Sequence, residues 1–204
     1  MTPVTVVDYG AGNLRSLRAA LERLDVDVEV TTRPGDVERA AIVVVPGVGA
    51  AGPAMERLET AGLAAAIRAA AERGANILGI CLGLQLLFER SEEGDTRCLG
   101  LLPGAVRRID WAATVPHMGW NDVTPAGGDA LGQALPAVCY FAHTYVAEPA
   151  DARDVVATTE LDGRPFASAV ARGRVAAVQF HPERSGPAGR ALLAALLRRA
   201  ADAP

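Results

Sequence analysis

A cysteine between two glycines, in Gly79-Ile80-Cys81-Leu82-Gly83, is the residue of this chain best placed to do chemistry. The segment joins an apolar run, ANILGI, to a helical pattern, LGLQLLFER. A sharp turn from strand to helix crowds the backbone and needs small residues two positions before and two after the turning residue. A thiol there stands at the strand's carboxyl end, where the amides of the following helix favour the thiolate. The pattern predicts a nucleophile, although an isolated cysteine in an apolar run is more often a small buried hydrophobe.

A cysteine nucleophile needs a base with an orienting group, and His181 with Glu183 offers both. The two lie in QFHPE, at the end of the apolar run RVAAVQF. In extended backbone, residues i and i+2 share a face, so the carboxylate can fix the tautomer of the imidazole. Taken alone, a His-x-Glu pair more often lies at the protein surface without a catalytic role. It becomes a candidate base here because Cys81 needs a partner. His117 and His143 have no acid nearby in sequence and are expected at most to support the site or bind.

Two glycine-rich loops follow predicted strands. In VVVPGVGAAGP, Gly47 and Gly49 flank Val48, so the backbone can adopt conformations closed to other residues and aim its amides into a cleft. An ordinary strand exit is an equally good interpretation of that loop. DYGAGNLRS lies between a strand and a helix, but Arg15 stands where a dinucleotide fingerprint needs its third glycine. We interpret it as a tight turn.

Composition bounds the class of protein. The 204 residues are 50% hydrophobic and 22% charged, which predicts a globular chain, and we expect a single domain over residues 1–204. The net charge of −4, with arginines scattered in ones and twos, gives no basic stripe for nucleic acid or membrane. Apolar stretches are broken by proline and glycine, and the N-terminus does not resemble a signal peptide, so we expect a cytoplasmic protein. Three widely spaced cysteines without a CxxC pair indicate neither a disulfide framework nor a zinc site, and we expect no metal and no cofactor.

Strand and helix patterns alternate in the first half of the chain. The expected strands are 3–7, 26–30, 41–45 and 75–80, and the expected helices are 14–24, 54–73 (closed by Gly74) and 82–90. This alternation predicts an α/β fold, with a mostly parallel sheet, helices on both faces and a ligand site at the carboxyl ends of the strands. Past Ser91, short turns link runs expected to form an antiparallel extension at the sheet's edge or a small second layer. These runs are 104–110, 137–148, 154–160, 164–173 and 174–180, followed by a helix over 185–200.

Three motifs together, PGVG, GICLGLQLLF and QFHPE, resemble the triad-type (class I) glutamine amidotransferases. The resemblance runs from about Val6 to Ser185, implies a flavodoxin-like fold, and places Cys81, His181 and Glu183 on a catalytic triad. DYGAGNLRS, VPHMGWN and YFAHTYV narrow it to the glutaminase subunits of imidazole glycerol phosphate synthase, in histidine biosynthesis. Small departures are found at Leu84, Ala177 and Arg184, where methionine, glycine and lysine are common in the family.

The resemblance implies that the chain hydrolyses glutamine to glutamate and ammonia through a cysteine thioester. It also implies a heterodimer, in which the ammonia passes to a separate barrel-shaped cyclase subunit. Oxyanion-binding amides are implied at Val48, Gly49 and Leu82, glutamine-binding groups at Gly49, Gln85, Thr144 and Tyr145, and a partner contact at Arg184. Trp120, in an MGWN segment that reads as an exposed turn, is a candidate interface anchor, and an ordinary half-buried tryptophan is an equally good interpretation.

Three other functions stay open at this point. A cysteine peptidase or other hydrolase on a similar sheet would use the same nucleophile and base. A regulatory subunit with a degenerate site is weakened as an explanation because all three triad positions are filled. A related glutaminase could supply ammonia to another pathway, and it would then co-purify with a different synthase.

Overall fold

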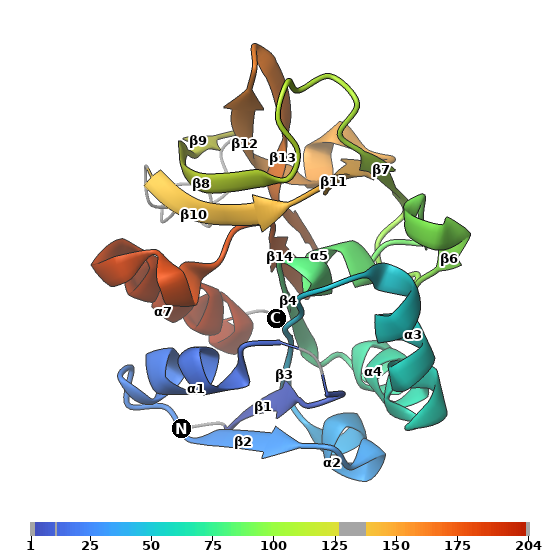
Figure 1. Ribbon diagram of the computed structural model, residues 1–204. Coiled ribbons are helices and arrows are strands. Elements are labelled where there is room, and N and C mark those ends of the chain that lie inside the picture. Colours follow the sequence, from blue (N-terminus) through green and yellow to red (C-terminus); the bar gives the residue numbers. More distant parts are fainter. Residues whose placement is uncertain (1–2, 11, 127–137, 203–204) are drawn as a thin grey trace.

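One large sheet runs through the computed structural model, which describes residues 3–10, 12–126 and 138–202 (Figure 1). Its strands follow the order β2-β1-β3-β4-β14-β13-β11-β7-β5-β6, while β12 pairs with β13 and β9 with β12. The parallel half of the sheet is formed by β1 (Val4–Val7), β2 (Val28–Thr31), β3 (Ile42–Val45), β4 (Asn76–Ile80) and β14 (Val175–Val178). The other strands are β5 (Arg90–Ser91), β6 (Thr96–Arg97), β7 (Gly104–Arg108), β9 (Thr124–Pro125), β11 (Tyr145–Pro149), β12 (Val155–Leu161) and β13 (Arg164–Arg172).

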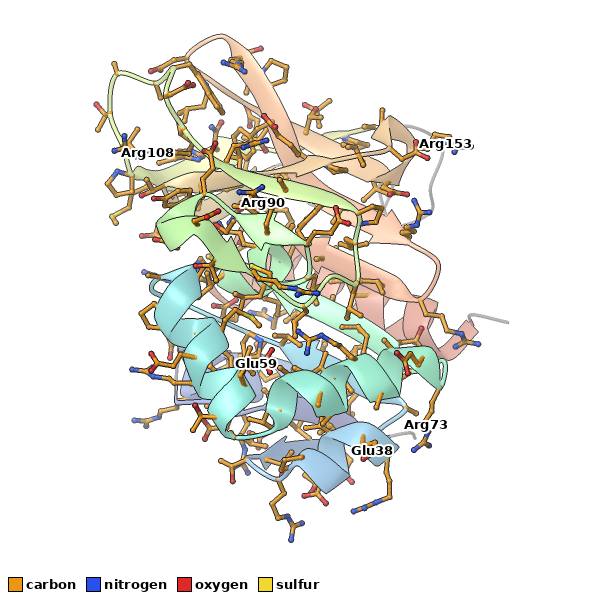
Figure 2. The ribbon with its side chains drawn as sticks, turned by 90° about the vertical axis from the view of Figure 1, so that its right-hand side faces the viewer. Glu38, Glu59, Arg73, Arg90, Arg108 and Arg153 are labelled. Atoms are coloured by element: carbon orange, nitrogen blue, oxygen red, sulfur yellow. The ribbon has the colours of Figure 1, made fainter. Side chains whose placement is uncertain are left out.

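Helices cover both faces of the parallel half (Figure 1). One face carries α1 (Leu14–Glu22) and α7 (Gly186–Asp202), and the other carries α2 (Pro34–Arg39), α3 (Ala51–Thr60), α4 (Leu63–Glu72) and α5 (Leu82–Leu86). Alternate residues of β3 point to the two sides: Val43 and Val45 pack with the α2–α5 cluster, and Val44 packs with α1 and α7. Figure 2 faces α3 and α4; Glu59 in α3 and Arg73 just after α4 are exposed there. The predicted α/β fold with helices on both faces is confirmed.

Past β5 the strands are mostly antiparallel, as predicted, and they take both of the expected forms. β13 joins the parallel half because it pairs antiparallel with β14, which in turn runs parallel to β4. A separate two-stranded sheet is formed by β8 (His117–Asp122) and β10 (Val138–His143) and lies above α7 in Figure 1. Short 3-10 turns are η1 (Glu93–Asp95), η2 (Ala152–Asp154) and η3 (Pro182–Arg184).

The sheet register brings three strand exits together. Val45 at the end of β3 pairs with Gly79 in β4, and Ile80 at the end of β4 pairs with Val178 at the end of β14. Because these three strands are parallel and end in register, the segments that follow them meet at one edge of the sheet. The PGVG loop, Cys81 and the QFHPE segment are those three segments.

The expected helix over 54–73 is two helices, and the single-helix prediction is wrong. The chain breaks between Thr60 and Leu63, where Gly62 has φ +72°, a left-handed conformation that glycine adopts without steric cost. Alanine and leucine are frequent on both sides of the break, which hid it from an argument based on composition. Gly74, predicted to close the helix, has φ +87° directly after α4, as a C-terminal glycine does.

Three further element predictions need correction. The helix expected over 82–90 ends at Leu86, because the backbone N–H groups of Leu99 and Leu101 donate to the carbonyls of Leu86 and Leu87 and draw the chain aside. The run expected over 137–148, of which residue 137 lies outside the described part, is two strands in different sheets, β10 and β11, which part at Thr144. MGWN, expected as a turn, lies within β8.

Candidate active site

Cys81 occupies the junction between β4 and α5, with φ +54° and ψ −110°. A left-handed φ at a residue with a side chain costs on the order of 1–3 kcal/mol, and such strain is concentrated at functional sites. The turn lifts the thiol from the strand's end toward the start of α5, whose first backbone N–H groups have no partner within the helix. The predicted strand-to-helix turn with cysteine at its apex is therefore present.

The two flanking glycines are required by close packing. A Cβ on Gly83 would collide with the carbonyl oxygen of Val45, and one on Gly79 would lie 2.9 Å from the backbone of Gly83 and 2.8 Å from the side chain of Leu87. Contacts below about 3 Å leave no room for a methyl group unless the backbone moves. The spacing G-x-C-x-G thus follows from the fit of α5 against β3 and β4.

His181 and Glu183 face one another at the exit of β14. Nδ1 of His181 lies 2.9 Å from Oε1 of Glu183, and each side chain is only 5% exposed. His181 is held from both sides: its N–H donates to the carbonyl of Tyr140, and its own carbonyl accepts from the hydroxyl of Ser185. The pair was predicted from extended backbone, but Glu183 lies in the 3-10 turn η3, so a tight turn brings the two side chains together.

The imidazole of His181 carries a proton at neutral pH. Burial lowers its pKa, but hydrogen bonds to Cys81 and Glu183 and the negative charges of both groups outweigh burial and raise the pKa to about 10. The histidine therefore connects the sulfur on one side with a buried carboxylate on the other. An imidazolium beside a thiol is the arrangement that activates cysteine nucleophiles.

A cavity of about 210 Å³ opens in front of the sulfur. It is smaller than the roughly 300–1,000 Å³ of sites for drug-sized ligands, so it suits a small metabolite. Its lining residues are Val48, Gly49, Cys81, Leu82, Gln85, Glu93, Pro116, Met118, Ala142, His143, Thr144 and Tyr145. The structure thus gathers around one cavity all six residues expected to bind the oxyanion or glutamine, and Trp120 and Arg184 lie outside it.

The PGVG loop has a fixed start and an open tip. The hydroxyl of Tyr9 donates to the carbonyl of Pro46 over 2.7 Å, and a Cβ on Gly47 would lie 2.5 Å from that hydroxyl. Gly49 instead has φ +100°, a Cβ placed on it would meet nothing within 4 Å, and Val48 is 44% exposed. The tip therefore has open space beside Gly49 and a backbone conformation that glycine adopts readily, whereas the start of the loop is closely packed.

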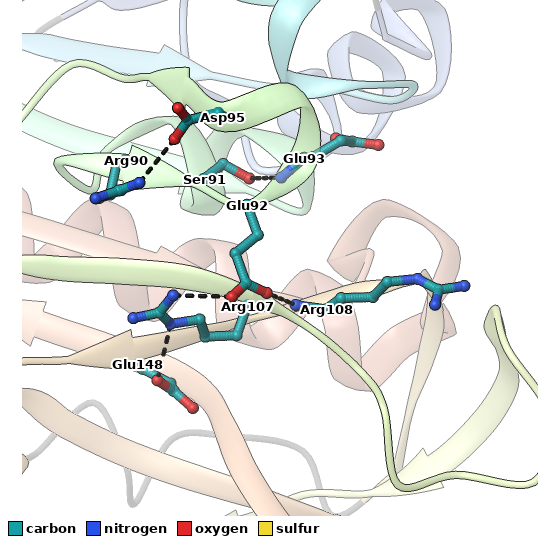
Figure 3. Close-up of polar contacts among 8 residues, drawn as sticks. All are labelled: Arg90, Ser91, Glu92, Glu93, Asp95, Arg107, Arg108 and Glu148. Carbon is teal, nitrogen blue, oxygen red and sulfur yellow. Dashed lines mark hydrogen bonds and ion pairs between the residues drawn. The ribbon is translucent and has the colours of Figure 1, made fainter.

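Glu93 lines the cavity and was not predicted from the sequence. Its Oε2 accepts the N–H of Ala51 at the start of α3 over 2.7 Å, and its own N–H donates to the hydroxyl of Ser91. Neighbouring Glu92 points away and binds Arg107 over 2.8 Å (Figure 3). Nothing in the acidic run SEEGD distinguishes the two residues, because the difference arises from where η1 packs against α3.

The comparison with known families settles the class of protein. The model of the class-I glutamine amidotransferases matches residues 5–200. The chain belongs to this amidotransferase family. The imidazole glycerol phosphate synthase subunit HisH of Moorella thermoacetica is 49% identical over 192 residues, which cover 93% of this chain and 91% of that protein. At this identity and coverage the chain also belongs with the HisH amidotransferases.

Two more comparisons describe the extent of the likeness. The chloroplastic imidazole glycerol phosphate synthase hisHF of Arabidopsis thaliana is 45% identical over 196 residues, covering 93% of this chain and 33% of that longer protein. A crystal structure of a glutamine amidotransferase superposes with a TM-score of 0.78 at 22% identity, covering 97% of this chain and 99% of that one. This structural likeness shows the fold of the amidotransferase.

Aromatic and apolar side chains are exposed on the two-stranded sheet of the amidotransferase. Met118 is 65% exposed and Trp120 60% exposed. Trp120 contacts the ring of Tyr140 edge-on, and the guanidinium of Arg184 lies 4.1 Å from the centre of that ring. Trp120 is thus more exposed than the half-buried tryptophan of the alternative interpretation.

Within residues 3–10, 12–126 and 138–202, no group of three or more His, Cys, Asp or Glu side chains is arranged to hold a metal ion. In the same part of the chain, no helix is long and apolar enough to cross a membrane. His117 and His143, expected at most in supporting roles, form a buried pair with Nδ1 of His117 2.9 Å from Nε2 of His143, and His143 lines the cavity.

Proposed function

We propose that this amidotransferase hydrolyses glutamine to glutamate and ammonia through a thioester on Cys81. We further propose that the ammonia passes to the cyclase subunit of imidazole glycerol phosphate synthase, in histidine biosynthesis. The single observation that carries the proposal is the positive φ of Cys81 at the wall of a small cavity, beside a buried His181–Glu183 pair. Membership of the HisH amidotransferases supports the pathway.

The first half of the reaction forms the thioester. The thiolate of Cys81 attacks the side-chain amide carbon of glutamine, and the carbonyl electrons move onto oxygen. Backbone N–H groups of Leu82 and of the Val48–Gly49 segment donate to this oxyanion, each worth roughly 10²–10³ in rate. His181 gives its proton to the amide nitrogen as the carbon–nitrogen bond breaks, which releases ammonia.

The second half of the reaction releases glutamate. His181, now neutral, takes a proton from water, and the resulting hydroxide attacks the thioester carbon. The carbon–sulfur bond breaks and restores the thiolate beside the imidazolium. Glu183 holds the ring in one tautomer throughout and stabilises its positive charge.

The amino-acid end of glutamine has matching groups in the cavity. Glu93 supplies an acidic side chain for the α-ammonium group. Gln85 uses its Nε2 for Tyr145 O and for Gln179, so its Oε1 is the atom that remains for the substrate. Thr144 and Gly49 line the remaining wall. A cavity of about 210 Å³ holds one amino acid rather than a peptide chain, which favours glutaminase over peptidase activity.

The exposed surface of Met118, Trp120, Tyr140 and Arg184 is the proposed partner interface. Met118 belongs both to this surface and to the cavity lining, so the cavity opens toward it. A subunit docked here would cover the opening and receive ammonia before water protonates it. This chain covers 33% of the chloroplastic hisHF, whose name joins H and F in one protein. That longer relative supports a partner subunit of this kind.

Glutamate release from glutamine tests this function. The chain and its Cys81→Ala variant are assayed alone and with the cyclase subunit plus a ligand of that subunit. We expect release that rises on complex formation and vanishes in Cys81→Ala, while the matched control Cys98→Ala, which removes a buried thiol that does not line the cavity, keeps its activity. No release by a folded, assembled complex would contradict the proposal.

A further inference from the structure

Gln179 contacts the reacting sulfur, and the mechanism above does not use it. The residue lies between β14 and His181 and is fully buried. Its Nε2 is 3.9 Å from Sγ of Cys81, within the range of a hydrogen bond to sulfur. A buried amide placed against a nucleophile has consequences that depend on whether its NH₂ or its oxygen faces the sulfur.

A backbone carbonyl fixes this orientation. The oxygen of Tyr145 can only accept, so the atom of Gln85 at 3.1 Å from it must be the NH₂ group. The same NH₂ lies 3.1 Å from the side chain of Gln179, which must therefore present its oxygen. The NH₂ group of Gln179 is then left to face Sγ of Cys81.

A second chain of hydrogen bonds reaches the same carbonyl from the other side. Nδ1 of His143 lies 2.9 Å from the oxygen of Tyr145 and must donate to it, so Nε2 of the neutral ring accepts from Nδ1 of His117. Nε2 of His117 in turn accepts from the NH₂ of Asn121, which also donates to a backbone carbonyl, that of Glu160.

Both histidines are neutral, as this series of hydrogen bonds requires. Burial lowers the pKa of His143 to about 3, against an opposing effect of its bond to Tyr145 O. Burial also lowers the pKa of His117. Because the backbone carbonyls of Glu160 and Tyr145 accept at the two ends of this series of hydrogen bonds, every donor in it meets an acceptor. A flipped Gln85 amide would set its oxygen against the carbonyl of Tyr145, and a flipped Gln179 amide would set its NH₂ against the NH₂ of Gln85.

We propose that the side-chain amide of Gln179 donates to the Cys81 sulfur and stabilises the thiolate, and that Gln85 is a positioning residue that orients this donor. His143 and His117 hold the carbonyl of Tyr145, to which Gln85 is bound. The thiolate thus has a donor besides the imidazolium of His181. The donor acts before attack, when sulfur is the nucleophile, and again when sulfur leaves the thioester. The proposal rests on Cys81 as the nucleophile of the proposed function.

Alkylation of Cys81 by iodoacetamide measures the thiolate directly and does not require turnover. The rate is followed against pH by mass spectrometry of the Cys81 peptide, in wild type and in Gln179→Met, which removes the donor at similar size. We expect the midpoint of the pH dependence to rise by about one unit, the effect of one hydrogen bond to a charged group. Cys98 and Cys139 serve as internal standards, because burial raises their pKa values to about 11 and 12.

The control is Ser168→Ala, a buried polar change beside the same residue: the carbonyl of Ser168 accepts the N–H of Gln179, and its hydroxyl does not contact the sulfur. This variant should keep the wild-type midpoint.

If Gln179→Met does not fold, the side-chain amide resonances of Gln179 in wild type are followed by NMR, and they should move at the pH of the alkylation midpoint. An unchanged midpoint in a folded Gln179→Met protein, or amide resonances that do not respond, would overturn the proposal. Glutamine turnover in the wild type is scored separately, so a failure of the glutaminase proposal is distinguishable from a failure of the donor.

Discussion

The hydroxyl of Tyr9 donates to the carbonyl oxygen of Pro46 over 2.7 Å and so ties the exit of β1 to the start of the PGVG loop. Both residues are buried, and the bond spans 37 positions of sequence. Burial above all, then the negative charge of Cys81, raises the pKa of Tyr9, so the hydroxyl keeps its proton and stays a donor. The loop that carries the proposed oxyanion amides is therefore held at its start by Tyr9, while Glu93 binds the N–H of Ala51 just after it.

Replacing this donor tests the anchor. Tyr9→Phe leaves the buried carbonyl of Pro46 without its partner, which costs about 1–3 kcal/mol of stability. We expect kcat for glutamine to fall with little change in KM, because the oxyanion amides act only in the transition state. Trp111→Phe is the matched control, since it removes a side-chain bond to the carbonyl of Leu161, away from the cavity. An equal loss of kcat in both variants would contradict the anchor.

Glycine at position 83 is tested by adding one methyl group. In Gly83→Ala the new Cβ meets the carbonyl of Val45, so α5 must move away from β3. We expect a loss of about 1–3 kcal/mol in the free energy of unfolding, together with loss of glutaminase activity. Gly52→Ala, in α3 with only Thr96 Oγ1 nearby at 3.4 Å, should be neutral or stabilising. Chemical denaturation of both variants checks this, and a neutral Gly83→Ala would contradict the packing argument.

Removing the carboxylate of Glu183 should affect both rate and pH dependence. Glu183→Gln keeps the shape but loses the charge that helps raise the pKa of His181 to about 10, and we expect kcat to drop by about 10²–10⁴-fold. His181 binds its proton more tightly folded than unfolded, so its contribution to stability is complete below about pH 6.5 and is lost as the pH rises through 10. The stability difference between wild type and variant should therefore shrink over that window in denaturation experiments. A difference that grows with pH would contradict the assignment.

The role given to Glu93 predicts a defect in binding rather than chemistry. Glu93→Gln keeps an acceptor for the N–H of Ala51 but removes the charge facing the cavity. We expect KM for glutamine to rise about 10- to 100-fold with kcat little changed, the value of one charge-assisted hydrogen bond. Glu92→Gln, which loses the exposed ion pair with Arg107 and keeps an acceptor for the N–H of Arg108, should leave KM unchanged in the same assay. Equal KM values in the two variants would contradict the assignment.

The proposed partner interface predicts a change confined to the complex. Trp120→Ala removes an exposed ring and should weaken binding of the cyclase subunit by about 2 kcal/mol or more, if the ring is an interface anchor. Calorimetric titration of one subunit with the other measures this. The thermal stability of the free variant should stay near that of wild type, because the side chain packs little in the free chain. Wild-type affinity in Trp120→Ala would move the interface elsewhere.

The sequence was most informative where the chemistry imposes a local backbone requirement. The glycines around Cys81 and the close spacing of His181 and Glu183 mark the site because each reflects a constraint within a few residues. Gly62 splits a continuous alanine-rich pattern by backbone conformation alone, which a periodicity argument does not detect. Glu93, Tyr9 and Gln179 gain their contacts through packing between distant segments, so no local pattern separates them from neighbouring residues of the same type.

Trapping the intermediate tests the central claim most directly. The complex with the cyclase subunit is mixed with glutamine, quenched in acid after a few milliseconds, and digested for mass spectrometry. The account predicts a glutamyl adduct on the Cys81 peptide that appears before glutamate accumulates, with none on the peptides of Cys98 or Cys139. Glutamate release without an adduct on Cys81, or undiminished release by Cys81→Ala, would contradict it.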